Sequence, residues 1–397
     1  MNSVKIALVG LAISFAALAS IVGYQYLAVG QEHNHDDDLS ANFYNFVSPT
    51  NYQGQTRTYY IASDEVKWNY APTGMNEITG MPLKDDTKAA VYTISGEDRI
   101  GSTYIKCLYR GYTDATFTTQ QPADPKWQHL GMLGPVIHAE VGDTIKVVFK
   151  NNCSIPTSMH PHGVFYDKAD EGAPYNDGVK DSDKPGESIP TGGTYTYTWQ
   201  VPLRAGPGPH DPSSIIWMYH SHVDEVGDTY AGLEGPMIIT RHGEANPDGS
   251  PQGVDSEFVT MFSVMDENSS PYLDKNIQTF TGNASSVNKD NDDFHESNLM
   301  HSINGYVFGN LPGLTMKVNS HVRWYVVDVG TEVDLHTPHW HGNTLLMDGM
   351  RTDMVELLPM SMKTLDMYPD NVGTWLYHCH VNDHILAGML ALYTVVP

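Results

Sequence analysis

Short stretches in which apolar and polar residues alternate make up most of the chain beyond its N-terminal region. Such alternation is typical of β-strands with one buried face, because successive side chains of a strand point to opposite sides. Turn-forming residues bound each stretch, and no long stretch keeps a helical period. The stretches expected to be strands are residues 59–71, 89–96, 143–152, 192–201, 257–267, 321–330 and 390–396. The pattern predicts an all-β fold of sandwich or Greek-key type.

The same series of motifs occurs twice along the chain. Each copy has a strand, a histidine pair followed by Gly, a Trp-x-Tyr-His-x-His motif, and a segment that begins Ala-Gly. The histidine-pair motifs are Met159–Gly163 and Pro338–Gly342, and the Trp-containing motifs are Trp217–His222 and Trp375–His380. A repeat of this kind predicts two copies of one β domain, which we expect at residues 57–244 and 245–397. The longer spacing between the motifs of the first copy is assigned to a surface loop, residues 174–193.

The chain opens with an apolar run, Ile6–Val22. Such a run at an N-terminus is typical of an export signal, and its length also permits an uncleaved membrane anchor. We therefore expect residues 1–31 to be a signal peptide or anchor, and the protein to be secreted or held at the outer face of the cell membrane. Residues 32–56 are expected to form an acidic linker. The histidine pair inside it, His33 and His35, is interpreted as part of a solvated tether rather than as a metal site.

The chain is strongly acidic, with a formal net charge of −25 over 397 residues. This balance argues against nucleic acid and anionic membrane surfaces as partners. It favours cationic small substrates or a basic partner protein, and it is equally compatible with a role in solubility alone. Of three cysteines, Cys379 belongs to a metal motif. In an oxidising compartment Cys107 and Cys153 could form a disulfide, a point that the sequence leaves open.

Pairs of the form His-x-His occur five times among 19 histidines, well above the frequency expected by chance. Four of the pairs fall at matching places in the repeat. Residues i and i+2 of a strand point the same way, so each pair places two imidazoles on one face. Imidazole binds copper, zinc, iron and nickel, so these side chains alone do not identify the metal. The eight histidines are His160, His162, His220, His222, His339, His341, His378 and His380.

Cys379 identifies the metal as copper. It is the central residue of His378–His380, it is followed by His384 and Met389, and it is preceded by His336. Two histidines, one cysteine and a weak axial methionine are the ligands of a blue copper site. Side chains alternate along a strand, so Cys379 would hold one copper on one side while both neighbours hold coppers on the other. That arrangement supplies a short covalent path for an electron.

The first copy of the repeat lacks this ligand set. Ser221 stands at the place of the cysteine, Leu233 at the place of the methionine, and Thr157 at the place of the upstream histidine. A hydroxyl and an isobutyl group do not replace a thiolate and a thioether as copper ligands. One blue copper site per chain is therefore expected.

The order of these motifs resembles that of the multicopper oxidases. The surrounding segments, among them MHPHGVFYDK, YHSHVDE, ESNLMHSINGYVFGNLPGL, DLHTPHWHG and YHCHVNDHILAGM, are most similar to the ceruloplasmin and hephaestin branch. The similarity covers nearly everything from about residue 90 to the end. It implies two cupredoxin-like domains and about four coppers per chain. It implies type 1 copper on His336, Cys379, His384 and Met389, type 2 copper on His160 and His339, and a type 3 pair on His162, His220, His222, His341, His378 and His380.

The chain departs from its large relatives in having two such domains instead of six. The eight cluster histidines divide evenly between the two copies, whereas in the relatives the cluster lies between the first and last domains of a closed ring. Head-to-tail association that closes gives a cyclic oligomer. The resemblance therefore implies a homotrimer, with each cluster between neighbouring chains. A monomer with an internal cluster is the less favoured alternative.

The segment ESNLMH resembles the part of ceruloplasmin that supplies ligands to ferrous iron, which implies such a role for Glu296 and His301. Asp383, just before a predicted copper ligand, matches as well. Carboxylates with one imidazole suit a hard cation such as iron. The alternatives are ordinary surface carboxylates beside a turn histidine, or a different electron donor such as a phenol, an amine or cuprous ion.

The expected reaction is one-electron oxidation of a donor at type 1 copper, coupled to four-electron reduction of O2 to water at the three-copper cluster, and the resemblance implies ferrous iron as the donor. Oxygen reduction consumes protons, and Asp224 and Glu225 are candidates for relaying them. A copper nitrite reductase shares the two-domain build but needs only one type 2 copper, so eight paired histidines argue against it. A non-enzymatic copper-binding module is disfavoured by the intact set around Cys379.

Overall fold

The computed structural model describes residues 54–331 and 334–397. The expected export signal, most of the expected acidic linker and the pair His33 and His35 lie outside these residues. Within the described part of the chain, no helix is both long and apolar enough to cross a membrane.

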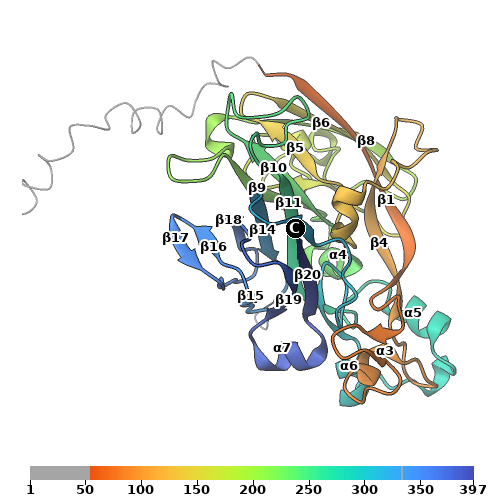
Figure 1. The fold of residues 1–397 in the computed structure, drawn as a ribbon. Coiled ribbons are helices and arrows are strands. Elements are labelled where there is room, and N and C mark those ends of the chain that lie inside the picture. Colours follow the sequence, from red (N-terminus) through yellow and green to blue (C-terminus); the bar gives the residue numbers. More distant parts are fainter. Residues whose placement is uncertain (1–53, 332–333) are drawn as a thin grey trace, which may run out of the picture. The chain divides into compact units, whose positions relative to one another are not determined.

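Two four-stranded sheets are built from the first half of the described chain (Figure 1). The first has the order β4 (Thr103–Tyr112), β1 (Thr56–Asn69), β6 (Thr144–Asn151), β8 (Thr194–Gln200). The second has the order β5 (Ile137–Glu140), β10 (Glu234–Thr240), β9 (Ser214–His220), β7 (His160–Pro161). A small ribbon pairs β2 (Met75–Asn76) with β3 (Met81–Pro82).

Two further sheets are built from the second half. A six-stranded sheet has the order β12 (Leu299–Ile303), β11 (Ser256–Asp266), β14 (Val322–Asp328), β18 (Met362–Met367), β16 (Leu345–Met347), β17 (Met350–Thr352). A four-stranded sheet has the order β13 (Thr315–Lys317), β20 (Leu390–Val396), β19 (Gly373–Cys379), β15 (Pro338–Trp340). The all-β prediction is confirmed. The boundary near residue 245 stays a prediction, and it falls between the last strand of one set and the first strand of the other.

The helices are short and lie between strands. They are α3 (Ala89–Thr93), α4 (Glu225–Ala231), α5 (Leu273–Phe280), α6 (Asp292–Ser297) and α7 (Asn382–Ala387), with 3₁₀ turns η1 (Pro125–Leu130), η2 (Lys168–Asp170), η3 (Asp181–Asp183), η4 (Leu203–Ala205) and η5 (Ala284–Ser286). Among the described residues none of these helices is longer than eight residues, so this part of the sequence has no long helical period.

One predicted strand is wrong. Residues 89–96 were expected to be extended, but Ala89–Thr93 form helix α3. The carboxylate of Asp86 accepts hydrogen bonds from the backbone N–H groups of Lys88 and Ala89, at 3.1 and 3.2 Å, and so satisfies amides at the start of the helix. The Thr93 hydroxyl donates back to the Ala89 carbonyl at 2.7 Å. These local polar contacts outweigh the β-branched character of the segment. The other six predicted stretches all contain strands.

Each pair of sheets encloses an aromatic core. Trp199 and Tyr197 are fully buried in the first core, and Trp324, Trp340 and Tyr377 in the second. Aromatic side chains of this size bury about 150–250 Å² each, so they supply much of the apolar burial. The structure also contains a disulfide between Cys107 and Cys153, with Cα atoms 6.0 Å apart, which decides the point that the sequence left open.

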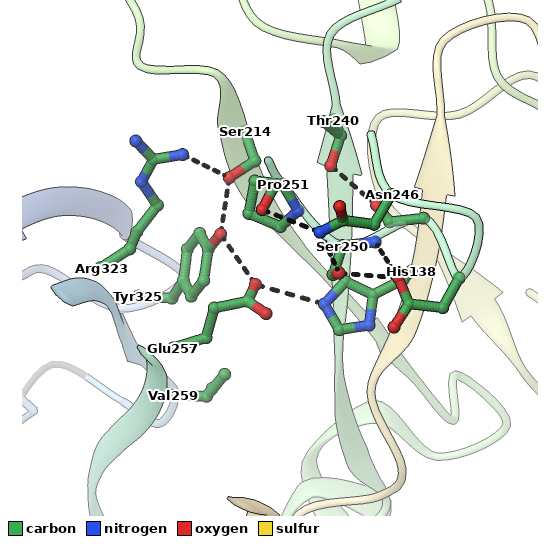
Figure 2. Close-up of polar contacts among 12 residues, drawn as sticks. His138, Ser214, Thr240, Asn246, Ser250, Pro251, Glu257, Val259, Arg323 and Tyr325 are labelled. Atoms are coloured by element: carbon green, nitrogen blue, oxygen red, sulfur yellow. Dashed lines mark hydrogen bonds and ion pairs between the residues drawn. The ribbon is translucent and has the colours of Figure 1, made fainter. Parts of the chain in front are cut away.

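The junction between the halves combines apolar packing with a buried polar network (Figure 2). Glu257 at the start of β11 places Oε1 3.2 Å from Nε2 of His138 on β5, and the same oxygen accepts from the Tyr325 hydroxyl at 3.2 Å. That hydroxyl lies 2.6 Å from Oγ of Ser214 on β9. Because strands from both halves contribute, the network joins the two sets of sheets at fixed positions.

The strand pairing places the histidine motifs in the same register in both halves. His160 on β7 lies opposite His220 on β9, and His339 on β15 lies opposite His378 on β19. Side chains directly opposite one another on antiparallel strands point to the same face. Each half therefore brings two histidine pairs together at one sheet edge.

A glycine directly after the first histidine pair of each half allows a tryptophan ring to pack closely against the backbone there. Gly163 and Gly342 adopt φ of +75° and +76°. A Cβ at Gly163 would lie 2.3 Å from the ring of Trp217, and one at Gly342 would lie 2.5 Å from the ring of Trp375. Only glycine satisfies both conditions without strain.

Candidate metal centres

Three of the four predicted blue copper ligands, His336, Cys379 and His384, meet beside the second core. Sγ of Cys379 lies 3.7 Å from Nδ1 of His336 and 3.6 Å from Nδ1 of His384, and the two Nδ1 atoms are 3.0 Å apart. All three side chains are buried, as is Met389, whose backbone oxygen accepts from the Cys379 N–H at 3.2 Å. β19 carries the cysteine, and α7 carries His384.

This triangle fits a single copper ion. Atoms that share one metal at about 2.0–2.3 Å lie roughly 3–4 Å from one another, which matches all three separations. Burial lowers the pKa of His384 to about 4, with help from His336 and His301, so its imidazole is neutral and able to ligate. Burial raises the pKa of the Cys379 thiol, which the backbone N–H groups of Thr337 and Val381 oppose at 3.4 and 3.5 Å. A bound cation would be needed to hold the thiolate.

Two buried carboxylates lie next to His336, and sequence reasoning missed both. Nε2 of His336 is 3.3 Å from Oδ1 of Asp334 and 3.8 Å from Oδ1 of Asp328. Asp334 is fixed by the N–H groups of Val264 and Thr331 at 2.6 and 2.8 Å. Burial and the neighbouring Asp334 raise the pKa of Asp328 to about 8. Carboxylates bonded to the second nitrogen of a ligand histidine fix its orientation. Nothing in the local sequence distinguishes them from other acidic residues.

The histidines of the first half form one set. Donor atoms of His160, His162 and His220 lie within 4.8 Å of one another, and the ring of His222 lies 5.3 Å from that of His160. Nδ1 of His160 donates to the Glu171 carbonyl at 2.7 Å, which leaves its Nε2 lone pair available. Nε2 of His162 and Nε2 of His220 converge to 3.1 Å. Burial, with neighbouring histidines, lowers the pKa of His162 to about 4 and that of His220 to about 3.

The histidines of the second half form a matching set. Donor atoms of His339, His341 and His378 lie within 4.8 Å, and the ring of His380 lies 5.3 Å from that of His378. Nε2 of His341 is 3.1 Å from Nε2 of His378. Nε2 of His339 is 3.6 Å from Oδ2 of Asp353, a half-exposed carboxylate that sequence reasoning also missed. Convergent imidazoles of this kind fit copper in both sets.

The two sets are separate within one chain. Among the residues that the structure describes, no hydrogen bond, ring contact or electrostatic interaction joins a histidine of one set to a histidine of the other.

Comparison with known families gives the identity of the repeat. Family models described as multicopper oxidase match residues 120–244 and 275–397, together more than half of the chain. The chain belongs to the multicopper oxidase family. The two matched segments contain the two copies of the histidine motifs.

The curated relatives are much longer than this chain. Hephaestin of Rattus norvegicus is 45 % identical over 344 residues, covering 86 % of this chain and 30 % of that protein. Ferroxidase HEPHL1 of Homo sapiens is 45 % identical over 341 residues (86 % and 29 %), and ceruloplasmin of Mus musculus is 44 % identical over 357 residues (89 % and 32 %). The chain therefore spans about a third of the length of these relatives. The resemblance inferred from the motifs is confirmed.

A solved structure described as a crystal structure of multicopper oxidase shares the fold. Its TM-score is 0.53 at 18 % identity, covering 86 % of this chain and 89 % of that chain. At this identity the likeness supports the predicted cupredoxin-like β-sandwich architecture and no more.

In this multicopper oxidase, Cys379 is linked to a histidine of the second set in two ways. His378 is its covalent neighbour, and Nδ1 of His378 donates to the Cys379 carbonyl at 2.7 Å. This hydrogen bond closes a second, shorter route between the thiol residue and the imidazole. It also leaves Nε2 of His378 as the atom with a free lone pair.

In the first half, the position that corresponds to the blue copper site is occupied by side chains that do not form a set of copper ligands. Oγ of Ser221 donates to Oδ2 of Asp228 at 2.6 Å and accepts from the Ser158 N–H at 3.0 Å. Leu233 and Thr157 are fully buried beside it. A hydrogen-bonded serine and an aliphatic side chain occupy the volume that cysteine and methionine occupy in the second half.

The predicted iron residues lie near His384 but do not form a closed ligand set. Among the described residues, the donor atoms of Glu296, His301 and Asp383 are not all within 4.8 Å of one another. His301 is buried and its ring lies 5.1 Å from the ring of His384, whereas Glu296 and Asp383 are exposed. The open arrangement suits a cation that enters and leaves from solvent.

The two proton-relay candidates differ in their contacts. Asp224 accepts from the Gly227 N–H at 3.4 Å and so caps helix α4. Oε2 of Glu225 lies 3.4 Å from Nε2 of His222. Only the second residue therefore contacts a histidine of the predicted cluster.

Proposed function

We propose that this protein couples the one-electron oxidation of ferrous iron to the reduction of O2 to water. The observation that carries the proposal is the placement of Cys379 between two cluster histidines and inside its own buried ligand triangle. The printed name of one relative, ferroxidase HEPHL1, supports iron as the electron donor.

The proposed copper ligands follow the motif assignment. Type 1 copper is assigned to His336, Cys379, His384 and Met389, type 2 copper to His160 and His339, and the type 3 pair to His162, His220, His222, His341, His378 and His380. This gives about four coppers per chain. Bound copper would supply one-electron redox chemistry at the first site and dioxygen chemistry at the cluster.

The residues of the chain have distinct tasks in this proposal. The electron would pass from Cys379 to either of its bonded neighbours, His378 or His380, and the hydrogen bond between His378 and the Cys379 carbonyl adds a second route to His378. Asp334 orients His336. Glu225, beside His222, is proposed as a proton carrier during oxygen reduction.

We propose that the active form is a homotrimer. The separation of the two histidine sets within one chain supports it, because each set supplies half of the required imidazoles. Three chains arranged head to tail would place the first half of one against the second half of the next, and the ring would close. Each trimer would then hold three clusters.

We propose that iron binds Glu296, His301 and Asp383. The carboxylate oxygens of Glu296 and Asp383 would favour the ferric product. The His301 ring lies next to the His384 ring, so it would lie on the electron route from iron to Cys379. The chain's acidity also favours a cationic substrate over nucleic acid.

We propose that the protein is exported, either secreted or tethered by its N-terminal segment. The disulfide supports an oxidising compartment.

The test is oxygen uptake by copper-loaded protein with ferrous iron and with an aromatic diamine. The double variant Glu296→Ala with His301→Ala should lose most of its iron-driven uptake and keep that driven by the diamine. If both donors are oxidised as by the wild type, the iron site is wrong. If no electron donor supports oxygen uptake, the oxidase assignment fails, and anaerobic assays with nitrite would test the reductase alternative.

A further inference from the structure

Tyr92 contacts the proposed iron site from the other half of the chain. It lies on α3, and α3 packs against α6, which carries Glu296 (Figure 1). The Tyr92 hydroxyl donates to Oε1 of Glu296 at 2.6 Å, across 204 residues of sequence. A donor–acceptor distance this short is typical of a hydrogen bond to a charged carboxylate.

The rest of the Tyr92 side chain is fixed by aromatic packing. Its ring meets the His301 ring edge to face at 5.9 Å and lies 6.4 Å from the Phe308 ring. The residue is 9 % exposed, so the phenol has little freedom to reorient. Tyr92 therefore contacts two of the three proposed iron ligands, Glu296 through its hydroxyl and His301 through its ring.

The geometry leaves the ligand atoms available. The described structure gives Oε2 of Glu296 no hydrogen-bond partner, while Oε1 is bonded to the phenol. Nδ1 of His301 contacts the Leu299 carbonyl at 3.0 Å; a carbonyl only accepts, so Nδ1 carries the proton and Nε2 keeps a lone pair. Tyr92 stays protonated at neutral pH, because burial, the bond to Glu296 and the charges of Glu296 and Asp383 raise its pKa.

We propose that Tyr92 is a positioning residue for the substrate cation, holding the exposed Glu296 carboxylate beside His301 so that its free oxygen faces the entering ion. Glutamate has three rotatable side-chain bonds, and an unrestrained exposed glutamate would lose that freedom only when the cation binds. The phenol restrains it in advance. This inference rests on the proposed iron site and adds a residue from the first half to it.

The variant Tyr92→Phe removes the hydroxyl and keeps the ring packing. Immobilising one such side chain changes affinity by about tenfold at most, so we expect KM for ferrous iron to rise about fivefold to tenfold. The kcat for iron should stay within about twofold, since the route through His301 and His384 is intact. Rates with an aromatic diamine should not change, and neither should the blue absorption of the loaded protein.

A matched control is available in Tyr112→Phe. The Tyr112 hydroxyl donates to Oδ2 of Asp64 at 2.7 Å, and Tyr112 is 7 % exposed. The Tyr112→Phe variant therefore loses the same kind of hydrogen bond from a side chain that is buried to a similar extent. This variant should leave KM for iron unchanged. A KM increase equal in both variants would overturn the positioning role, because it would reflect general loosening.

A binding measurement separates this inference from the proposed function. Titration calorimetry with Co²⁺, which the oxidase cannot use as an electron donor, should give about fivefold to tenfold weaker binding to Tyr92→Phe than to wild type or Tyr112→Phe. If wild type oxidises no iron but the cobalt difference holds, the ferroxidase proposal fails and the positioning role stands. If Co²⁺ does not bind wild type, or binds Tyr92→Phe equally well, the positioning role is wrong.

Discussion

Replacing Glu257 with Gln should weaken the junction between the two halves of the chain. The side chain is 3 % exposed and contacts His138 and Tyr325, each at 3.2 Å (Figure 2), and Lys126 at 3.0 Å. Glutamine has nearly the same shape but no charge, so it keeps the packing and removes the electrostatic part of the contact.

The size of the effect follows from the acidity of Glu257. Burial alone would raise its pKa, but the charges and hydrogen bonds of His138 and Lys126 outweigh burial and lower the pKa from 4.5 to about 2. At 1.36 kcal/mol per unit this corresponds to about 3 kcal/mol of folding free energy. Lys126 is 42 % exposed, so solvent screens its share, and we expect a loss of about 2–3 kcal/mol at pH 7.

The pH dependence gives the prediction a definite sign. The folded pKa lies below the unfolded one, so the stabilisation is complete above about pH 4.5 and is lost as the pH falls towards 2. The difference in unfolding free energy between wild type and Glu257→Gln should therefore be about half as large at pH 3 as at pH 7. Denaturant unfolding of copper-free protein at constant ionic strength measures both values.

A matched control is Glu244→Gln. Glu244 pairs with Arg241 at 3.4 Å but is 48 % exposed, so its loss should cost less than about 0.5 kcal/mol. If Glu257→Gln is as mild as this control at pH 7, or if its cost does not change with pH, then the buried network does not stabilise the junction through the charge of Glu257.

Two further predictions concern the metal centres. Cys379→Ser should remove the blue absorption and about one copper per chain, and oxygen uptake with every electron donor should fall at least about 100-fold; retention of the rate would exclude Cys379 from the electron path. Gly342→Ala should cost more than about 3 kcal/mol, because its Cβ would lie 2.5 Å from an indole ring at φ +76°. The control Gly349→Ala, at φ +74° with nothing within 4 Å of the added Cβ, should lower the free energy of unfolding by about 1 kcal/mol. If both variants have the same free energy of unfolding, the close approach to the Trp375 ring does not account for the requirement for glycine at position 342.

Local pattern predicted the parts of the site that lie within single strands. The spacing of His-x-His reports that two imidazoles share a face, and the structure adds that His160 and His339 lie opposite His220 and His378 in the same register. Because the motifs occur in both copies of the repeat, the sequence indicated that the two halves hold their histidines in equivalent arrangements, even though the pairing of the strands was unknown. The triangle around Cys379 followed from ligand chemistry, because few other combinations of thiol, imidazole and thioether occur at that spacing.

The parts that escaped prediction depend on contacts between distant segments. Asp328 is acidic in the middle of an apolar run, and its closeness to His336 follows only from the way β14 packs against the second core. Tyr92 was assigned to a strand, yet it lies on a helix whose first backbone N–H groups, those of Lys88 and Ala89, donate to the Asp86 carboxylate. Alternation in so short a segment does not distinguish a strand from a helix, because local polar contacts of this kind also contribute.

These contacts explain why the two halves contribute differently to the proposed metal sites. The first half has lost the blue copper ligands, and the bonded pair Ser221 and Asp228 occupies their place, so restoring a single cysteine would still leave Thr157 and Leu233 where ligands are required. The first half nevertheless contributes its own histidine set, and through Tyr92 it contacts the residues next to His384 in the second half. Electron entry and oxygen reduction would thus each depend on both halves. Entry would use both halves of one chain, and the cluster would use halves of two chains. Because the loss of the first blue site leaves one entry point per chain, all electrons reaching a cluster would pass through Cys379 and then through one of its covalent neighbours, His378 or His380.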